Sequence, residues 1–423
     1  MKKSLSDRIT LTNGVEIKNR LFKSAMSEQL GDKSHNPTDG LVQLYHTWAR
    51  GGIGVSVTGN VMVDRTALGE PRNVVLDKKS DLEKFNTWAD AGRTNHTHLW
   101  MQLNHPGKQT PKFLDTEPVA PSPIPLEKGL SKVFNTPREL TEDEIEIIIQ
   151  QFGVSAGLAK KTGFTGVQIH SAHGYLINQF LSPHHNRRKD QWGGSLENRS
   201  RFVMEVYHAI RRAVGEDFPV SIKLNSSDFR DGGFSLEEAI QVAVKLEQAG
   251  INLVEISGGS YENPEMMGNS AEKPTEDPVK NSGRTKEKTD REGYFLDYAK
   301  AIADSLTIPL VLTGGFRSGS AMENAINDGA TDMIGLARPL AMEPDFPNRL
   351  LEDRSLSISL PRLSTGIRAL DKTISIGLTW YEYQLYTIGK GKKVNPNASE
   401  WRSVFQTFWR LGVHGFTQRR AKG

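Results

Sequence analysis

Short β-rich runs alternate with amphipathic segments of helical period along most of the chain. Eight runs have the apolar, β-branched and aromatic content typical of strands: "RLFKSAMS", "GVSVTGN", "HLWMQLN", "GVQIH", "PVSIKLN", "NLVEIS", "IPLVLTG" and "TDMIGLA". The helical patterns lie near residues 40–50, 81–95, 141–161, 196–214, 236–249, 292–305, 319–328 and 343–352. The alternation therefore predicts eight strand–helix units in succession.

Eight such units favour an α/β protein built as a (β/α)8 TIM barrel, because each helix returns the chain to a neighbouring parallel strand. A doubly wound open sheet is the alternative, and the lack of G-x-G-x-x-G after the first strand argues against it. A β-hairpin at about residues 8–18 precedes the first strand, since Asn13-Gly14 suits a tight turn. We expect residues 1–355 to form the barrel and 356–423 to form a helical C-terminal extension that packs on the barrel or on a partner subunit.

Three helical segments carry a sequence signature of a helix N-terminus, a Ser or Thr followed three residues later by Glu. These pairs are Ser80–Glu83, Thr141–Glu144 and Ser235–Glu238. In such a capping box each side chain accepts a hydrogen bond from the backbone of the other residue. The signature predicts helix starts at these three positions.

Two long excursions interrupt the alternation, a proline-rich one at 105–140 and a charged one at 258–291. Both follow predicted strands, so both would lie at the C-terminal face of a barrel, where active sites of this fold are found. Each is a lid candidate, and a plain surface loop explains each equally well.

Composition narrows the class of protein. The 423 residues are within the range of barrels with insertions. The net charge of +3, with acids and bases interspersed, gives no indication of a nucleic-acid partner. The absence of cysteine excludes disulfides, zinc–thiolate sites, cysteine-bound iron–sulfur clusters and a cysteine nucleophile. No signal-peptide pattern and no apolar run of about 18–20 residues is present, so we expect a cytoplasmic protein without a membrane span.

Polar residues occur on one face of several predicted strands. In "VQIH" Gln168 and His170 share a face, and Gln102 shares a face with Trp100 and Asn104. Lys223 lies on the face opposite Ile222 and Leu224. That face must point into the barrel, where a lysine requires a partner. Glu255 on the next strand is one candidate partner, and a ligand that develops negative charge is the other.

Glycine-containing turns follow the last two strands, in "LTGGFRSG" and "GLARPL". Barrels commonly hold phosphate at the loops after strands 7 and 8. Gly314 and Gly315 allow a close backbone approach, and Arg338 can bind phosphate in a bidentate fork. These residues predict a phosphate site.

The segment "IHSAHGYL" places His170, His173 and Tyr175 together at the end of a predicted strand. A metal site would need further ligands, and His184 and His185 follow, but no H-E-x-x-H pattern occurs. Two neutral imidazoles can instead polarise a carbonyl or nitro oxygen while a phenol supplies a proton. Polar residues of an ordinary turn are the third interpretation.

The longer stretch "IHSAHGYLINQFLSPHHNRRKDQWGGSLENRSRF" resembles the signature of the old yellow enzyme family of FMN-dependent ene-reductases. The resemblance extends from about Asn19 to Leu340 and includes "NRLFKSAMS", "VTGN", "MQLNHPGK", "SIKLNSSDF", "ISGG", "TGGFRSG" and "ARPL". It implies a flavoprotein with FMN across the barrel mouth.

The resemblance also implies roles for individual residues. The positions that match contacts along the flavin ring are Ala25, Met26, Ser27, Gly59 and Gln102. Lys223 matches the cation near flavin N1 and O2. The positions that match the phosphate cradle are Gly314, Gly315, Ala337 and Arg338. His170 and His173 match the pair that binds the substrate oxygen, and Tyr175 matches the proton donor.

The implied reaction is NAD(P)H-dependent reduction of the activated C=C bond of α,β-unsaturated carbonyl or nitro compounds. NADH and NADPH remain alternatives, because the nicotinamide shares the substrate site. Two positions depart from the family: Ser27 stands where relatives often have threonine or cysteine near flavin O4, and Lys223 stands where several carry arginine.

Other interpretations stay open. One is an FMN barrel that oxidises 2-hydroxy acids, for which the expected histidine and arginine set is missing after strand 7. Another is a flavin-free, phosphate-binding lyase or isomerase. The tail "WRSVFQTFWRLGVHGFTQRR" mixes aromatics with arginines, so weak binding to a membrane surface and packing in a homo-oligomer are both considered.

Overall fold

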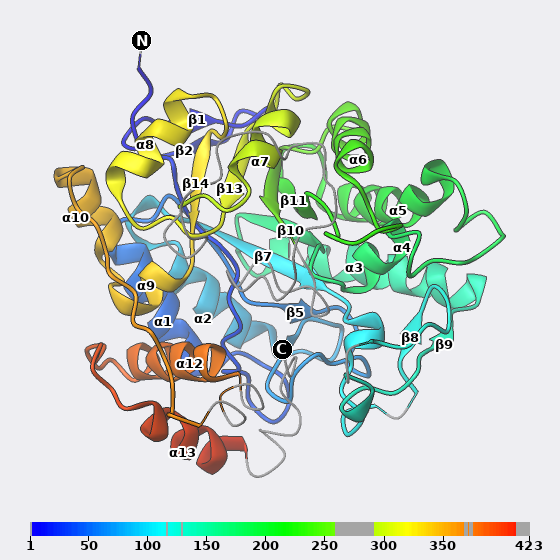
Figure 1. The fold of residues 1–423 in the computed structure, drawn as a ribbon, viewed down its shortest axis with the longest axis horizontal. Coiled ribbons are helices and arrows are strands. Elements are labelled where there is room, and N and C mark those ends of the chain that lie inside the picture. Colours follow the sequence, from blue (N-terminus) through cyan, green and yellow to red (C-terminus); the bar gives the residue numbers. More distant parts are fainter. Residues whose placement is uncertain are drawn as a thin grey trace.

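The computed structural model describes residues 2–115, 117–127, 130–258, 292–367, 371 and 375–411. Within these ranges eight parallel strands close into a barrel, since each pairs with the next and the last pairs with the first (Figure 1). In order around the barrel they are β3 (Leu21–Lys23), β4 (Val55–Val57), β7 (His98–Asn104), β10 (Gly166–Ser171), β11 (Val220–Asn225), β12 (Leu253–Ser257), β13 (Leu310–Thr313) and β14 (Met333–Leu336). The (β/α)8 barrel is thus confirmed, and the open sheet is excluded.

Helices surround this barrel at the positions that the sequence pattern predicts. They are α1 (Asp39–Arg50), α2 (Leu82–Gly92), α3 (Glu142–Lys161), α5 (Leu196–Val214), α6 (Leu236–Gln248), α7 (Leu296–Ala303), α8 (Gly319–Asn327) and α10 (Phe346–Glu352). Two short helices were not predicted: α4 (Leu176–Leu181) follows β10, and α9 (Arg338–Met342) follows β14.

Two of the three predicted capping boxes form, at Thr141 before α3 and at Ser235 before α6. The prediction at Ser80 is wrong, because Asp81 is the residue that precedes α2. The Ser80 hydroxyl instead donates to the Val75 carbonyl and accepts from the backbone N–H of Asp77. The Ser80 hydroxyl is therefore used by a tight turn before the helix and does not cap the helix.

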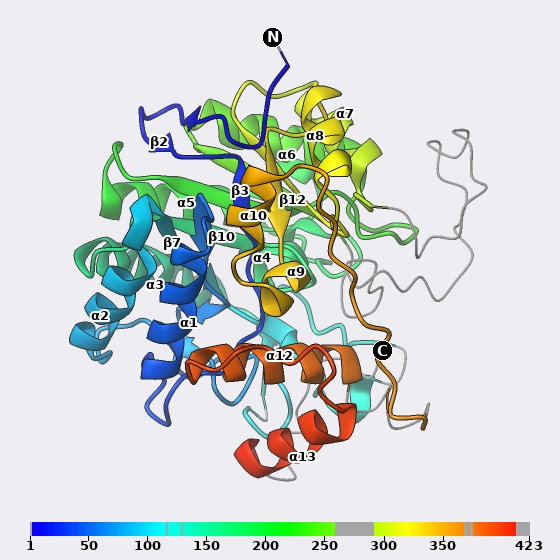
Figure 2. The same cartoon turned by 90° about the vertical axis from the view of Figure 1, so that its left-hand side faces the viewer.

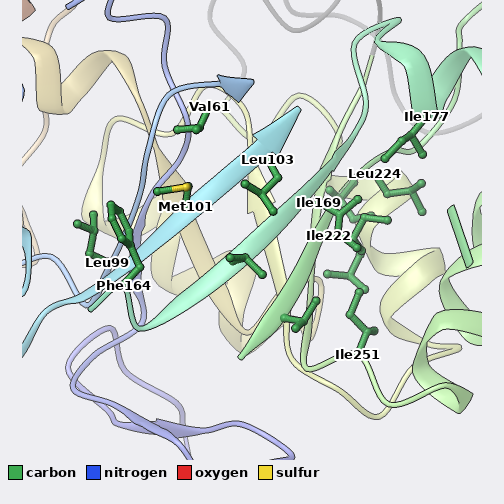
Figure 3. Packing of buried hydrophobic residues seen from close by; sticks show 14 of the residues in the cluster. Val61, Leu99, Met101, Leu103, Phe164, Ile169, Ile177, Ile222, Leu224 and Ile251 are labelled. Atoms are coloured by element: carbon green, nitrogen blue, oxygen red, sulfur yellow. The ribbon is translucent and has the colours of Figure 1, made fainter. Parts of the chain in front are cut away.

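Period-2 alternation separates two layers of side chains on the barrel wall. Figure 3 shows Leu99, Met101, Leu103, Ile169, Ile222 and Leu224 among the buried apolar residues on the outer face of β7, β10 and β11. The inner cluster is separate and contains Phe22, Val55, Val57, Trp100, Leu253, Val311 and Met333. The wall thus packs apolar side chains on both faces, and the inner face also carries the polar residues Gln102, Gln168, Lys223 and Glu255.

The N-terminal hairpin closes the other end of the barrel. Strands β1 (Ile9–Thr10) and β2 (Glu16–Ile17) pair antiparallel, and Gly14 takes a φ of 82° in the turn between them. Ile9, Leu11 and Ile17 join the inner apolar cluster of the barrel. The predicted hairpin is confirmed, and it acts as a plug.

The proline-rich excursion at 105–140 contains only short elements in its described part. They are the 3-10 turns η2 (Gly107–Gln109) and η3 (Leu130–Lys132) and the strands β8 (Val119–Ala120) and β9 (Arg138–Glu139), which pair with each other. Strands β5 (Val61–Met62) and β6 (Val74–Val75) extend the sheet beside β7, and η1 (Thr94–His96) precedes it. Residues 259–291 of the second lid candidate lie outside the described residues.

Two helices of the C-terminal extension are described, α12 (Ile376–Gly389) and α13 (Glu400–Leu411). Figure 2 shows α12 beneath α1 and α9, at the opposite end of the molecule from the hairpin, with α13 on its far side. The extension therefore covers part of the C-terminal face of the barrel. No helix in the described part of the chain is long and apolar enough to cross a membrane.

Candidate active site

The two histidines and the tyrosine meet where β10 ends. The His170 ring centroid lies 5.2 Å from that of His173 and 4.7 Å from that of Tyr175, both in edge-on geometry. His173 has a φ of 60°, and Gly174 follows with 77°. Two successive left-handed residues turn the chain sharply, which brings Tyr175 back beside His170. The structure thus assembles the trio that the sequence pattern indicates.

Hydrogen bonds orient these three side chains. Nδ1 of His170 accepts from the backbone N–H of Ala172 at 3.3 Å, so the neutral ring carries its proton on Nε2. Nε2 of His173 lies 2.8 Å from the Ser257 hydroxyl. The Tyr175 oxygen accepts from Nδ2 of Asn60 at 3.1 Å. The arrangement can present an imidazole N–H and a phenol to one small molecule.

A buried polar layer lies beside the trio inside the barrel. Lys223 Nζ is 3.0 Å from Glu255 Oε1, and Glu255 Oε2 accepts from Gln168 at 2.8 Å. Gln168 in turn accepts from Gln102 at 2.7 Å, and Thr313 donates to Glu255 at 2.7 Å. Oε1 of Gln102 is buried and has no hydrogen-bond partner among the described residues. A buried acceptor of this kind is expected to accept a hydrogen bond from a bound ligand.

The segment after β3 forms the strip that runs along one side of this layer. Gly59 faces it, and a Cβ there would lie 2.5 Å from the Met26 carbonyl oxygen, so a side chain cannot be accommodated. Ser27 Oγ lies 2.8 Å from both carboxylate oxygens of Glu70 and 3.0 Å from Oε1 of Glu382. Ala25 and Met26 are half-buried in the same strip.

A second buried lysine lies on the other side of the wall. Lys23 Nζ contacts Glu28 Oε1 at 3.3 Å, the Tyr45 hydroxyl at 2.9 Å and the Val57 carbonyl at 2.6 Å. Burial lowers the pKa of Lys23 to about 8, against the effect of Glu28. Burial also raises the pKa of Glu28, and the Tyr45 hydroxyl donates to this carboxylate.

The predicted phosphate residues lie together at the ends of β13 and β14. The residues that line an open hollow there include Gly314, Gly315, Ala337 and Arg338. Gly315 has a φ of 79°, and a Cβ there would lie 2.5 Å from the ring of Tyr294. Arg338 Nη2 donates to the Tyr294 hydroxyl at 3.1 Å. The hollow thus combines a side-chain-free backbone with one fixed cation.

The structure also brings in residues that sequence reasoning missed. They are Ser24, Asn60, Glu70, Ser257, Thr313 and Glu382. Thr313 and Ser257 end predicted strands on their inner faces, so period-2 alternation could have found them. Glu382 lies in the extension, and no local pattern connects it with the barrel.

His184 and His185 do not join the trio in a metal site. Nδ1 of His185 lies 2.9 Å from Lys108 Nζ, and His184 pairs with Glu127 at 3.5 Å. Burial lowers the pKa of His185 well below its usual value. In the described ranges no group of three or more His, Asp or Glu side chains is arranged to hold a metal ion.

Comparisons with known proteins agree with this geometry. The NADH:flavin oxidoreductase / NADH oxidase family matches residues 5–357. The "NADH-dependent flavin oxidoreductase iccE" of Talaromyces variabilis is 36% identical over 417 residues, which cover 91% of this chain and 98% of that protein. The corresponding iliE of Hypocrea jecorina is 36% identical over 378 residues, covering 84% and 92%.

Solved structures share the fold. A complex of 2-naphthoyl-CoA reductase with 2-naphthoyl-CoA has a TM-score of 0.74 at 28% identity and covers 84% of this chain and 53% of its own. The old yellow enzyme homologue of Zymomonas mobilis has a TM-score of 0.69 at 24% identity and covers 84% and 94%.

Proposed function

This chain belongs to the NADH:flavin oxidoreductase / NADH oxidase family, and from this premise we propose that it binds FMN and uses NADH or NADPH to reduce the activated C=C bond of α,β-unsaturated carbonyl or nitro compounds. One observation carries the proposal. His170, His173 and Tyr175 converge beside the buried layer that contains Lys223 and Gln102. Membership of an oxidoreductase family gives no support to the flavin-free lyase or isomerase.

The residues of the inner layer fit an isoalloxazine ring. Gln102 offers a buried carbonyl oxygen that lacks a donor among the described residues, and a ring N–H is a suitable one. Lys223, held by Glu255, supplies a fixed cation where the ring gains negative charge. Gly59 lets the backbone of the strip pack closely, because a Cβ there would lie 2.5 Å from the Met26 carbonyl oxygen. Ala25, Met26 and Ser27 are the residues of the strip that would hold the ring.

The hollow at Gly314 and Gly315 fits the phosphate of the same cofactor. A phosphate needs close N–H donors and a cation, and Ala337 and Arg338 complete such a set. A flavin held by these residues would supply hydride transfer between the nicotinamide and the β-carbon of the substrate.

The chain's own residues direct the second half of the reaction. Nε2 of His170 donates a hydrogen bond to the substrate oxygen, and His173 binds the same oxygen. These contacts draw electron density toward this oxygen. Tyr175 donates its proton to the α-carbon. Asn60 supports this step, because a hydrogen bond donated to the phenol oxygen stabilises the phenolate that remains.

Tyr175→Phe tests the mechanism, because it removes only the hydroxyl. A positioned general acid contributes about 10²- to 10⁴-fold in rate, so enone reduction should slow by that factor. Reduction of the flavin by NAD(P)H needs no such proton and should stay near normal. Stopped-flow spectroscopy measures each half-reaction separately. Tyr207→Phe is the matched control, since the hydroxyl of this buried tyrosine donates to the Ala249 carbonyl and accepts from Arg211 Nε, both outside the site. Equal slowing of both half-reactions would contradict the assignment.

Arg338→Ala tests the cofactor. A hydrogen bond to a charged group contributes about 1.5–3 kcal/mol, which corresponds to roughly 10- to 100-fold weaker FMN binding. Flavin absorbance of the purified protein and titration of the apoprotein measure this change. Arg349→Ala removes an exposed arginine that pairs with Glu343 and should retain FMN. A full flavin complement in the Arg338 variant would refute the phosphate site.

We also propose that residues 1–355 act as the flavin domain and that 356–423 are an extension of it. The family match ends at residue 357, and α12 packs on α1 and α9, which supports this division. A homo-oligomer remains part of the proposal, and gel filtration of the intact chain tests it.

A further inference from the structure

The C-terminal extension reaches the candidate flavin strip. Glu382 of α12 is buried, with an exposed fraction of 3%, although α12 lies outside the part of the chain that the family matches. Its Oε1 lies 3.0 Å from Ser27 Oγ and 3.0 Å from Nε2 of Gln29. One carboxylate oxygen therefore joins two residues of the strip to the extension.

The other helix of the extension holds the same strip. Arg410 of α13 donates to the Gln29 carbonyl at 2.7 Å and stacks over the Tyr386 ring at 4.5 Å. Gln29 itself has a φ of 49°, in the left-handed region that residues with a side chain avoid. Such a conformation persists only where its surroundings hold it. Here both helices of the extension supply those contacts.

Ser27 lies between two carboxylates. Glu70 contacts its hydroxyl from the barrel side, and Glu382 contacts it from the extension. A serine hydroxyl has a single hydrogen, and in these contacts Ser27 donates it toward the carboxylate oxygens. The hydroxyl then presents lone pairs, and not its hydrogen, to anything that lies along the strip.

We propose that Glu382 is a positioning residue of the flavin site, which holds Ser27 and Gln29 in place and lowers the reduction potential of the bound flavin. The inference rests on the proposed function. Within this proposal Glu382 is ionised, and its negative charge beside Ser27 would disfavour the electrons that a flavin bound along the strip takes up. In this proposal the extension lowers the reduction potential of the bound flavin, although it lies outside the barrel domain.

The test compares Glu382→Gln with Glu352→Gln in the flavin-loaded full chain. Glu382→Gln keeps the shape and the oxygen that accepts from Gln29, but it removes the charge. We expect the equilibrium to shift about tenfold toward reduced flavin, which is about 30 mV for a two-electron couple, with a displaced flavin absorption band. Glu352 is exposed at the end of α10, and its substitution should change neither.

Glu382→Leu separates positioning from charge. It removes both contacts, so the backbone amides of Ser27–Leu30 should exchange hydrogen faster by mass spectrometry, whereas Glu382→Asp should partly restore slow exchange. Wild-type potential, spectrum and exchange in the Gln and Leu variants would overturn the inference while leaving the proposed function intact. A wild-type chain that binds no flavin would overturn both, so the two failures are distinguishable.

Discussion

Two lysine–glutamate pairs are buried in this barrel on opposite faces of its wall. Lys23 of β3 points outward beneath α1 and lies 3.3 Å from Glu28, whereas Lys223 of β11 points inward and lies 3.0 Å from Glu255. Both lysines are almost fully buried. Burial and distance therefore do not distinguish a structural pair from one at a candidate active site.

The surroundings do distinguish them. An ammonium group has three donors, and Lys23 uses them on Glu28, Tyr45 and Val57, under the rings of Tyr45 and Trp48. The Lys223 pair belongs instead to a layer in which Gln102 Oε1 lacks a partner among the described residues. A complete set of partners indicates a structural role, and an incomplete set beside the barrel mouth indicates a ligand.

The largest expected effect is on stability. Lys23→Met leaves the Glu28 charge buried without its cation, and breaking such a pair costs about 3–5 kcal/mol. Urea denaturation measures this loss. Lys84→Met removes a surface pair with Asp32 and should leave the free energy of unfolding nearly unchanged, because solvent screens exposed ion pairs. A Lys23 variant as stable as the wild type would show that the Lys23–Glu28 pair does not have a structural role.

The next effect concerns the inner pair. The double variant Lys223→Met/Glu255→Gln removes both charges, so it avoids a lone buried carboxylate. Loss of a fixed stabilising group should still slow flavin reduction by about 10²- to 10³-fold. Lys23→Met/Glu28→Gln, its counterpart on the outer face, should reduce flavin at nearly the wild-type rate. Stopped-flow rates that fall equally in both double variants would show that the two pairs do not differ in role.

The smallest effect is a pH dependence of stability. The pKa of Lys23 is lowered to about 8, first by burial and in part by Lys223. In the unfolded chain a lysine titrates near about 10.4, so the unfolded state binds more protons between about pH 8 and 10.4. The free energy of unfolding should therefore rise with pH across this window, by at most about 3 kcal/mol.

Lys18 has a pKa lowered in the same way, also to about 8, so the wild type alone cannot isolate Lys23. The informative quantity is the difference between the wild type and Lys23→Met from pH 8 to 10. Parallel stability curves would mean that Lys23 does not titrate in this window.

Much of the barrel and of the trio could be predicted from local patterns. Strand alternation identifies the face of Lys223 and Gln102, and the capping boxes at Thr141 and Ser235 mark true helix starts. These features depend on residues a few positions apart, whose geometry the backbone period sets. The capping box predicted at Ser80 does not form, because the backbone N–H of Asp77, three residues earlier, donates to the same hydroxyl.

Partners from distant segments could not be predicted. Asn60 meets Tyr175 across 115 residues, and Glu382 meets Ser27 across 355. Local period assigns a side chain to the inner or outer face, and in this protein it also identifies the inward lysine. Which group then stands opposite that side chain depends on closure of the barrel and on the docking of α12, because these alone set the distance between residues far apart in the chain.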